Sequence, residues 1–246
     1  MKIVAIVQAR MGSTRLPGKI LMDVAGRPMI AQQLRRLQKC SLVNEIVVAT
    51  TIHDIDDPVV RLAEHEGVTW YRGSQSDVLA RYVEAAEQTK ADVIVRLTAD
   101  CPLIDPQITD KVIQELVDHS SSCDYASNVQ QRTFPRGLDV EAFFRDTLLR
   151  IDRLGQSTSA REHVTIVPRS ERPDLFLCRS VTDTEDNSDL RWTVDTETDL
   201  KLIRILYEEL DLGNRVAPYR EILGYARSHP DLSEINQQIE TWSPAG

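Results

Sequence analysis

The feature that most constrains the fold is a regular alternation of short apolar runs with longer amphipathic segments. Three runs are rich in isoleucine and valine, namely residues 2–7, 45–50 and 92–97. The segments between and after them repeat apolar side chains at helical spacing, namely residues 29–38, 58–66 and 77–89. Strands with little alternation are typical of parallel sheets that are covered on both faces. The order of these segments predicts a doubly wound or related α/β sheet.

The second half of the chain follows a looser pattern. We expect helices at residues 107–119 and 197–210, strands at residues 124–128 and 138–143, and a short strand at residues 191–194. Residues 219–228 and 232–239 predict a helical tail that is broken at Pro230. The length of 246 residues suits a single domain. We expect an insertion at about 123–183 and a helical tail at about 218–246, and the apolar positions of residues 138–144 suit either a dimer interface or the core.

The charge and the cysteines exclude several classes of protein. The 29 basic and 38 acidic residues give a net charge of −9, whereas nucleic-acid binding usually needs a basic excess. The first apolar run turns polar at Gln8, so it is too short for a signal peptide or a membrane span. The four cysteines lie far apart without a CxxC pair, which argues against a zinc or redox motif. These features predict a soluble cytoplasmic protein without nucleic-acid or membrane partners.

The loop after the first predicted strand, residues 8–19, concentrates groups that bind phosphate. It contains two glycines, two hydroxyl side chains and three cations. Open α/β sheets bind ligands at this end of their strands, glycines let the backbone approach closely, and cations neutralise phosphate charge. It is not a Walker A loop, because Gly12 and Gly18 are separated by five residues and Ile20 replaces the serine or threonine that reaches Mg²⁺. We predict a polyphosphate site; the alternative is a flexible basic loop with turn glycines.

Residues 9–19 contain the pattern Ala-Arg-x-x-Ser-Thr-Arg-Leu-Pro-Gly-Lys. This pattern resembles the nucleotide-binding signature of sugar-activating cytidylyltransferases, which charge KDO and acylneuraminic acids with CMP. Residues 1–210 resemble the branch of spore-coat polysaccharide biosynthesis proteins. The resemblance implies a GT-A-like, Rossmann-like fold with a mixed, mostly parallel sheet flanked by helices. It also implies a homodimer that uses Mg²⁺ and CTP, transfers CMP to a small anionic acceptor such as a sugar acid, and releases pyrophosphate.

The same resemblance assigns roles to residues of the loop. Arg10 and Lys19 are implied to be catalytic. The residues of this loop that are implied to bind the nucleotide are Ala9, Arg10, Gly12, Ser13, Arg15 and Lys19.

Two aspartates follow predicted strands and are expected to hold the metal ion. Mg²⁺ is commonly bound by one or two carboxylates together with phosphate oxygens, and Asp100 lies at the end of a strand, toward the loop. Asp195 directly follows the short strand predicted at residues 191–194 and comes just before a helix that begins with acidic residues. The resemblance, rather than the spacing, pairs Asp100 with Asp195 as metal ligands and catalytic residues. Asp100 could instead cap a helix or turn, and capping is the favoured reading for Asp105, which precedes Pro106.

Residues 71–79 match the family pattern Arg-Gly-Ser-x-x-Asp-Val-Leu. By resemblance, Arg72 and Ser74 lie near the base and ribose of the nucleotide, and Thr98 stands where related enzymes carry an amide that contacts the base. The alternative for residues 71–79 is a loop with a helix cap at Ser76 or Asp77.

Two further segments, residues 134–141 and 159–165, resemble the spore-coat branch and are expected to bind the acceptor. The residues implied are Arg136, Asp139, Arg161, Glu162 and His163. Arginines suit bidentate contacts with a carboxylate or phosphate, which predicts an anionic acceptor. His163 is a candidate to orient or deprotonate an acceptor hydroxyl; alternatively, Glu162 and His163 form a structural pair at a helix start.

Two other functions fit part of this pattern. A glycosyltransferase of the same architecture would also hold Mg²⁺ with aspartates, but it would not need the Lys19-bearing loop for a triphosphate. A non-catalytic nucleotide-binding module would not need to keep Asp100, Asp195, Arg10 and Lys19 together. The hypothesis of a nucleotidyltransferase assigns a role to each of these residues.

Overall fold

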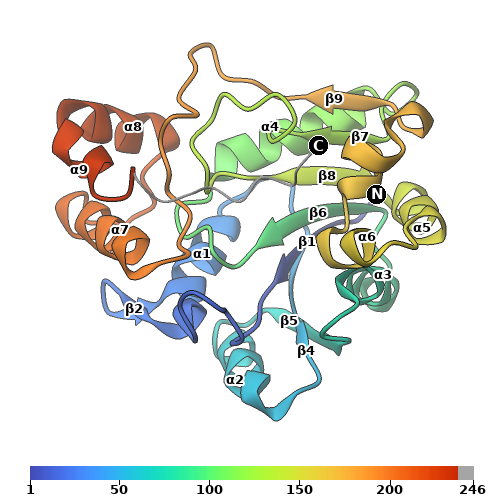
Figure 1. Ribbon diagram of the computed structural model, residues 1–246, viewed down its shortest axis with the longest axis horizontal. Coiled ribbons are helices and arrows are strands. Elements are labelled where there is room, and N and C mark those ends of the chain that lie inside the picture. The colour runs from blue at the N-terminus through green and yellow to red at the C-terminus, as the bar shows by residue number, and fades with distance from the viewer. Residues whose placement is uncertain (238–246) are drawn as a thin grey trace.

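The computed structural model describes residues 1–237, and its centre is a mixed sheet (Figure 1). Within these residues the sheet order is β5-β4-β1-β6-β8-β7-β9. The strands are β1 (Ile3–Gln8), β4 (Glu45–Thr51), β5 (Thr69–Gly73), β6 (Val93–Thr98), β7 (Tyr125–Ser127), β8 (Glu141–Phe144) and β9 (Cys178–Ser180). Strands β5, β4, β1 and β6 are parallel, β8 is antiparallel to β6 and β7, and β9 is parallel to β7. The predicted mixed, mostly parallel sheet is confirmed.

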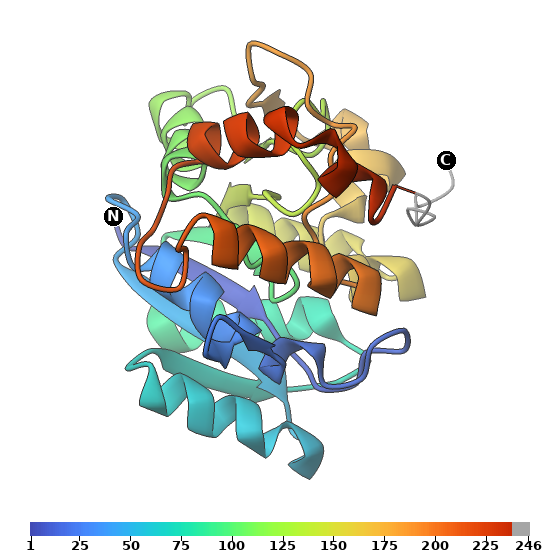
Figure 2. The same ribbon diagram turned by 90° about the vertical axis from the view of Figure 1, so that its left-hand side faces the viewer.

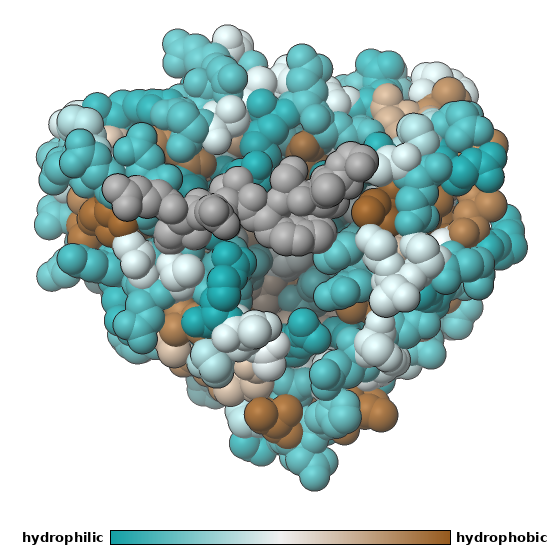
Figure 3. Space-filling model, in the orientation of Figure 1, coloured by the Kyte–Doolittle hydropathy of each residue, from teal (hydrophilic) through white to brown (hydrophobic). Residues whose placement is uncertain are grey.

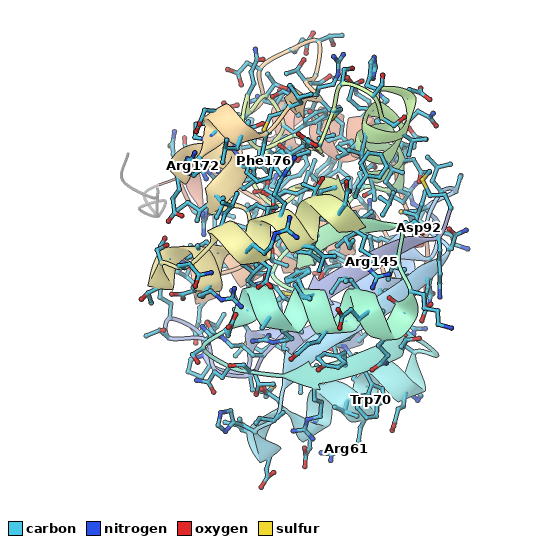
Figure 4. The ribbon with its side chains drawn as sticks, turned by 90° about the vertical axis from the view of Figure 1, so that its right-hand side faces the viewer. Arg61, Trp70, Asp92, Arg145, Arg172 and Phe176 are labelled. Atoms are coloured by element: carbon cyan, nitrogen blue, oxygen red, sulfur yellow. The ribbon has the colours of Figure 1, made fainter. Side chains whose placement is uncertain are left out.

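Helices cover both faces of the sheet. They are α1 (Met29–Leu37), α2 (Asp57–His65), α3 (Val78–Thr89), α4 (Pro106–Asp118), α5 (Arg145–Leu154), α6 (Thr158–His163), α7 (Glu197–Glu209), α8 (Tyr219–Ser228) and α9 (Pro230–Glu234). Alternate residues of β1 face two different cores. Ile3, Ala5 and Val7 pack with residues of α1, α2, α4, α7 and α8, whereas Val4 and Ile6 pack with residues of α3, α5 and α6. Figure 2 shows α7 and α8 in front of the sheet, and Figure 4 shows α3 and α5 on the opposite side.

Capping side chains fix the starts of two helices where the sequence predicts them. Asp105 accepts a hydrogen bond of 2.9 Å from the backbone N–H of Ile108, at the start of α4. Asp77 accepts one of 2.8 Å from the backbone N–H of Ala80, at the start of α3. Each bond satisfies a backbone donor that the first helical turn leaves unpaired.

Three predicted elements differ from the structure. The strand predicted at residues 191–194 is wrong, because only an isolated bridge joins Arg136 to Arg191 and the backbone N–H of Val194 donates to the carbonyl of Asp100 instead. The strand predicted at residues 138–143 begins only at Glu141, as β8. Before it, the Asn128 side chain donates to the carbonyl of Leu138 and accepts from the backbone N–H of Val140, in place of bonds to a neighbouring strand. The segment 71–73, which could be a loop, belongs to edge strand β5.

The tail also differs in detail. Helix α8 matches the predicted residues 219–228, but Pro230 begins α9 rather than only interrupting the tail. Helix α9 ends at Glu234, and the last two residues of the predicted helix, 238 and 239, lie outside the described residues. None of the helices within residues 1–237 combines the length and apolar character needed to cross a membrane.

The predicted insertion contributes to the main sheet rather than forming a separate layer. Strands β7, β8 and β9 all come from residues 123–183. The apolar side chains of Leu138, Val140 and Phe143 are buried in the cores of this chain, so they are core residues. The face shown in Figure 3 is mostly hydrophilic, and its hydrophobic residues form small separate patches.

Candidate active site

A cavity of about 260 Å³ opens at the carboxyl ends of β1 and β6. We call it the loop cavity. Three segments that are far apart in the sequence line it: the loop after β1, the end of β6 and the segment before α7. The predicted residues that it brings together are Ala9, Arg10, Gly12, Ser13, Arg15, Lys19, Thr98, Asp100 and Asp195.

Lys19 lies between the two aspartates of the loop cavity. Its ammonium group donates hydrogen bonds of 2.6 Å to the carbonyl of Val194 and 2.9 Å to Oδ1 of Asp195. The same nitrogen lies 3.6 Å from Oδ2 of Asp100. Lys19 is only 9% exposed, so these contacts are partly shielded from water. The structure thus brings together two carboxylates that the sequence could not pair by spacing.

Asp195 is in contact with three cations. Besides Lys19, the guanidinium of Arg15 lies 2.9 Å from its Oδ2 atom and that of Arg191 lies 2.7 Å from the same atom. Burial alone would raise the pKa of Asp195, but the charges and hydrogen bonds of Lys19, Arg191 and Arg15 lower it below its ordinary value. Asp195 is therefore a carboxylate at neutral pH. No pattern in the sequence singles out Arg191 as a partner of Asp195.

The two aspartates suit a divalent cation. A positive charge already lies between Asp100 and Asp195, because the Lys19 ammonium contacts both carboxylates. The hydroxyl of Thr98 donates to Asp100 and helps to orient it. Residues 1–237 contain no cluster of three or more His, Cys, Asp or Glu that could hold a metal ion alone. Two carboxylates with phosphate oxygens from a substrate are a usual Mg²⁺ environment.

The loop after β1 is folded around Met11. The backbone N–H groups of Ser13 and Gly18 both donate to the Met11 carbonyl at 2.9 Å, and the Met11 N–H donates to Asp56 at 2.6 Å. Gly18 has φ +72°, a left-handed conformation that favours glycine. Arg10 is exposed and forms no ion pair with the described carboxylates. The loop therefore holds its shape while leaving one cation available.

The sequence also matches the model of a known protein family. The sequence model of the family described as Cytidylyltransferase matches residues 4–214. This chain belongs to the cytidylyltransferase family. The predicted enzyme class, a CTP-dependent nucleotidyltransferase, is confirmed.

Individual proteins resemble this cytidylyltransferase over most of their length. It is 35% identical over 241 residues to the uncharacterized protein MJ1063 of Methanocaldococcus jannaschii, covering 97% of this chain and 96% of that protein. It is 32% identical over 214 residues to the spore coat polysaccharide biosynthesis protein SpsF of Bacillus subtilis, covering 84% and 87%. The structure of a cytidylyltransferase from Leptospira borgpetersenii has a TM-score of 0.90 and 31% identity, covering 99% of this chain and 100% of that one.

Two residues predicted to contact the base and ribose do not line the loop cavity of this cytidylyltransferase. The guanidinium of Arg72 donates to Asp57 at 2.7 Å and to two backbone carbonyls of the segment 51–53. The hydroxyl of Ser74 accepts a hydrogen bond from the backbone N–H of Asp77. Arg72 thus joins β5 to the segment between β4 and α2, and Ser74 stabilises the turn between β5 and α3. Their contact with a nucleotide stays a prediction.

The residues predicted to bind the acceptor lie in several places. Asp139 forms a bidentate pair with Arg132, with both distances 2.7 Å. Arg161 pairs with Asp77 and with Asp152. These partners hold Asp139 and Arg161 in place, and their contact with an acceptor stays a prediction.

The two other predicted acceptor residues on α6 have different surroundings. Glu162 is exposed. Burial lowers the pKa of His163, the charges of Arg96 and Arg169 lower it further, and Glu162 opposes the change. The imidazole of His163 is therefore mainly neutral at pH 7, as a proton acceptor must be.

Arg136 differs from the other predicted acceptor residues. It lines a second, smaller cavity of about 80 Å³, together with Arg191 and residues near α7, α8 and α9; we call it the tail cavity. Burial lowers the pKa of Arg136, as do the charges of Arg132 and Arg191, while Asp139 opposes them. No carboxylate within residues 1–237 forms an ion pair with Arg136. This guanidinium is therefore half-buried without a counter-ion, which suits the binding of an anion.

A buried carboxylate near the site is a feature that the sequence reading missed. Glu141, in β8, is 2% exposed and pairs with Arg96 of β6. The hydroxyl groups of Tyr125 and Thr165 donate to it at 2.7 Å and 2.9 Å. Arg96 also donates to Gln8, which lines the loop cavity. A glutamate within an otherwise apolar run was the signal that could have revealed it.

Proposed function

We propose that this cytidylyltransferase transfers CMP from CTP to an anionic sugar acid or related acceptor and releases pyrophosphate, in the biosynthesis of a surface polysaccharide or glycoconjugate. The observation that carries the proposal is the loop cavity, which is lined by three cations and two carboxylates, namely Arg10, Arg15, Lys19, Asp100 and Asp195. Cations suit a triphosphate and two carboxylates suit its divalent ion. The resemblance to sugar-activating enzymes and the similarity to SpsF support the acceptor class.

Arg10, Arg15 and Lys19 bind the triphosphate in this proposal. Arg15 and Lys19 are already held at the cavity by Asp195, at 2.9 Å each. Groups that are oriented before the substrate arrives lose little entropy on binding and need little reorganisation during the reaction. Arg10 and Lys19 then stabilise the negative charge that builds on the departing pyrophosphate.

Asp100 and Asp195 would hold a Mg²⁺ ion together with phosphate oxygens of CTP. When bound, such an ion neutralises charge on the phosphate oxygens and acts as a Lewis acid. Thr98 keeps the Asp100 carboxylate oriented, and Arg191 does the same for Asp195.

The reaction is an in-line displacement at the α-phosphorus of CTP. An acceptor oxygen forms a bond to this phosphorus while the bond to the oxygen that bridges to the β-phosphorus breaks. Pyrophosphate leaves with the electron pair of that bond, and the acceptor hydroxyl gives its proton to a base. His163 is our candidate for this base, because its lowered pKa leaves it neutral at pH 7.

The remaining predicted residues complete the proposal. Arg72, Ser74 and Thr98 contact the base and ribose, and Arg136, Asp139, Arg161 and Glu162 contribute to acceptor binding. Residues 1–246 work as one nucleotidyltransferase domain, in a homodimer.

CTP with Mg²⁺ should stabilise the fold against heat, and UTP, ATP and GTP should not. A ligand at about 100 times its Kd stabilises a protein by roughly 2.7 kcal/mol. At this chain length, each kcal/mol raises Tm by roughly 2–4 °C, so we expect an increase of about 5–11 °C. A thermal-shift series with each nucleotide, with and without MgCl₂, measures it. An equal shift with GTP or UTP would contradict the base preference, and an equal shift without MgCl₂ would contradict the metal requirement.

Arg136→Ala should raise the KM for the acceptor by about 10- to 100-fold. Hydrogen bonds to charged groups contribute roughly 1.5–3 kcal/mol, and each 1.4 kcal/mol is a factor of ten. The KM for CTP should stay unchanged, because Arg136 lines the tail cavity and not the loop cavity. Steady-state pyrophosphate release measures both constants, using whichever sugar acid of a panel supports turnover.

Arg215→Ala is the matched control for this variant. Arg215 is an exposed arginine that pairs with Glu221, away from both cavities. An unchanged acceptor KM in Arg136→Ala, or an equal increase in Arg215→Ala, would show that Arg136 does not bind the acceptor.

A further inference from the structure

The C-terminal tail reaches the candidate active site through one buried side chain. Asn236 follows α9 and lies beyond residues 4–214, the part of the chain that matches the family. Its amide nitrogen donates to the carbonyl oxygen of Arg191 at 2.9 Å and to Oδ1 of Asp199 at 2.8 Å. Asn236 is only 3% exposed. Figure 2 shows α8 and α9 running back alongside α7. The hydrogen bond to Asp199 places Asn236 beside the first turn of α7.

Asp199 accepts hydrogen bonds from several groups near the site, one of which is the Asn236 amide. It is fully buried, and it accepts hydrogen bonds from Nε of Arg191 and from the backbone N–H of Asp195, both at 2.9 Å. The amide of Asn236 donates to the same buried carboxylate at 2.8 Å. Asn236 is thus one of the donors that satisfy its acceptor atoms away from water.

Arg191 connects this buried carboxylate to the candidate metal ligand. Its Nε atom donates to Asp199, and its Nη2 atom donates to Oδ2 of Asp195 at 2.7 Å. The side chain of Arg191 is 9% exposed and lines the tail cavity. Arg15 and Lys19 also contact Asp195, but both line the loop cavity, where the proposed function has them bind phosphate. Of these three cations, Arg191 is the one that does not line the loop cavity.

We propose that Asn236 is a positioning residue for the metal site. It fixes the Asp199–Arg191 pair, and that pair fixes the orientation of the Asp195 carboxylate. The inference rests on the proposed function, because it assumes that Asp195 holds the divalent ion. In this proposal the C-terminal tail contributes to metal binding through Asn236.

The chemistry of the amide explains why asparagine suits this position. The two hydrogens of its nitrogen serve two acceptors, the Arg191 carbonyl and the Asp199 carboxylate. Aspartate has the same shape but only acceptor atoms when ionised, so it would face both oxygens without a donor and would repel Asp199. Serine keeps one donor, and alanine keeps none. Shape and hydrogen bonding can therefore be separated at this single position.

The experiment is a titration of the full chain with MnCl₂ in the presence of CTP, followed by electron paramagnetic resonance. Partners that orient metal ligands typically change metal affinity by 10–100-fold when they are mutated. We expect the Kd for Mn²⁺ to rise about 10-fold or more in Asn236→Ala and in Asn236→Asp, with Asn236→Ser between them and the wild type. If Asn236→Ala does not fold, the comparison of aspartate with serine still tests the proposal.

Leu232→Ala is the control for a purely structural effect. Leu232 is a buried residue of α9 that packs in the core, so its truncation should lower Tm while the Kd for Mn²⁺ stays at the wild-type value. The inference is overturned if Asn236→Asp binds Mn²⁺ like the wild type while Asp195→Asn does not. It is equally overturned if Leu232→Ala weakens Mn²⁺ binding as much as Asn236→Ala. If Asp195→Asn binds Mn²⁺ like the wild type, the metal assignment of the proposed function fails instead, and the inference falls with it.

Discussion

Asp100→Asn lowers kcat for pyrophosphate release by about 1,000-fold in the proposed mechanism. Asp100 is one of two carboxylates that contact the Lys19 ammonium, and its replacement removes half of the charge that would hold the divalent ion. A metal ion stabilises the transition state by several kcal/mol, and each 1.36 kcal/mol is a factor of ten. Turnover at saturating CTP and MgCl₂ measures the loss, and an unchanged Tm shows that the fold is intact.

Asp118→Asn is a suitable control for this substitution. Asp118 ends α4, where its side chain accepts a hydrogen bond from Gln114 on the surface. Its replacement should leave kcat unchanged. Wild-type turnover in Asp100→Asn, with an unchanged requirement for MgCl₂, would remove Asp100 from the metal site.

Glu141→Gln should lower the stability of the fold by about 3–5 kcal/mol, because it leaves the buried guanidinium of Arg96 without its counter-ion. At roughly 2–4 °C per kcal/mol, Tm falls by about 6–20 °C. Calorimetry or circular dichroism at pH 7 measures the change. Glu221→Gln is the matched control, because Glu221 pairs with Arg215 on the exposed surface, and its replacement should leave Tm nearly unchanged.

The effect of Glu141→Gln should also depend on pH. Burial alone would raise the pKa of Glu141, but Arg96, Arg169 and the hydrogen bond from Tyr125 lower it below its ordinary value of 4.5. A carboxylate with a lowered pKa adds stability above its unfolded pKa and loses it as pH falls through the folded value. The difference in Tm between wild type and variant should therefore shrink below about pH 4.5. A constant difference down to acidic pH would show that Glu141 contributes through packing instead of charge.

The central part of the fold could be predicted because its signals are local. Strands β1, β4 and β6 lie within one residue of the predicted segments, since a buried parallel strand is a nearly continuous apolar run. The edge strand β5 gave a weaker signal, because it carries exposed side chains such as Trp70, which is 37% exposed and lies at the outer edge of the sheet in Figure 4. The segment before α7 was misread as a strand, because its backbone bonds to the loop at Asp100.

Candidate site residues could be predicted from the sequence only where they lie close together in one segment. The composition of the loop from Arg10 to Lys19 is by itself enough to predict a phosphate site there. The resemblance, and not the spacing, supplied the pairing of Asp100 with Asp195. The contacts of Asp195 with Arg191, and of Asp199 with Asn236, could not be read from the sequence, because each depends on how α7 and the tail pack after folding. A single arginine or asparagine in a polar segment carries no local signal of such a role.

The contact between Lys19 and Asp195 has a consequence for how the protein is made. These residues are 176 positions apart, and Asn236 is added later still. At a synthesis rate of roughly 5–20 residues per second, Lys19 is made about 9–35 s before Asp195. During this time the first strands can assemble, but Arg15 and Lys19 lack the carboxylate of Asp195. A growing chain thus carries an incomplete site until Asp195 is made, and chains that stop before the tail lack the contacts of Asn236 with Arg191 and Asp199.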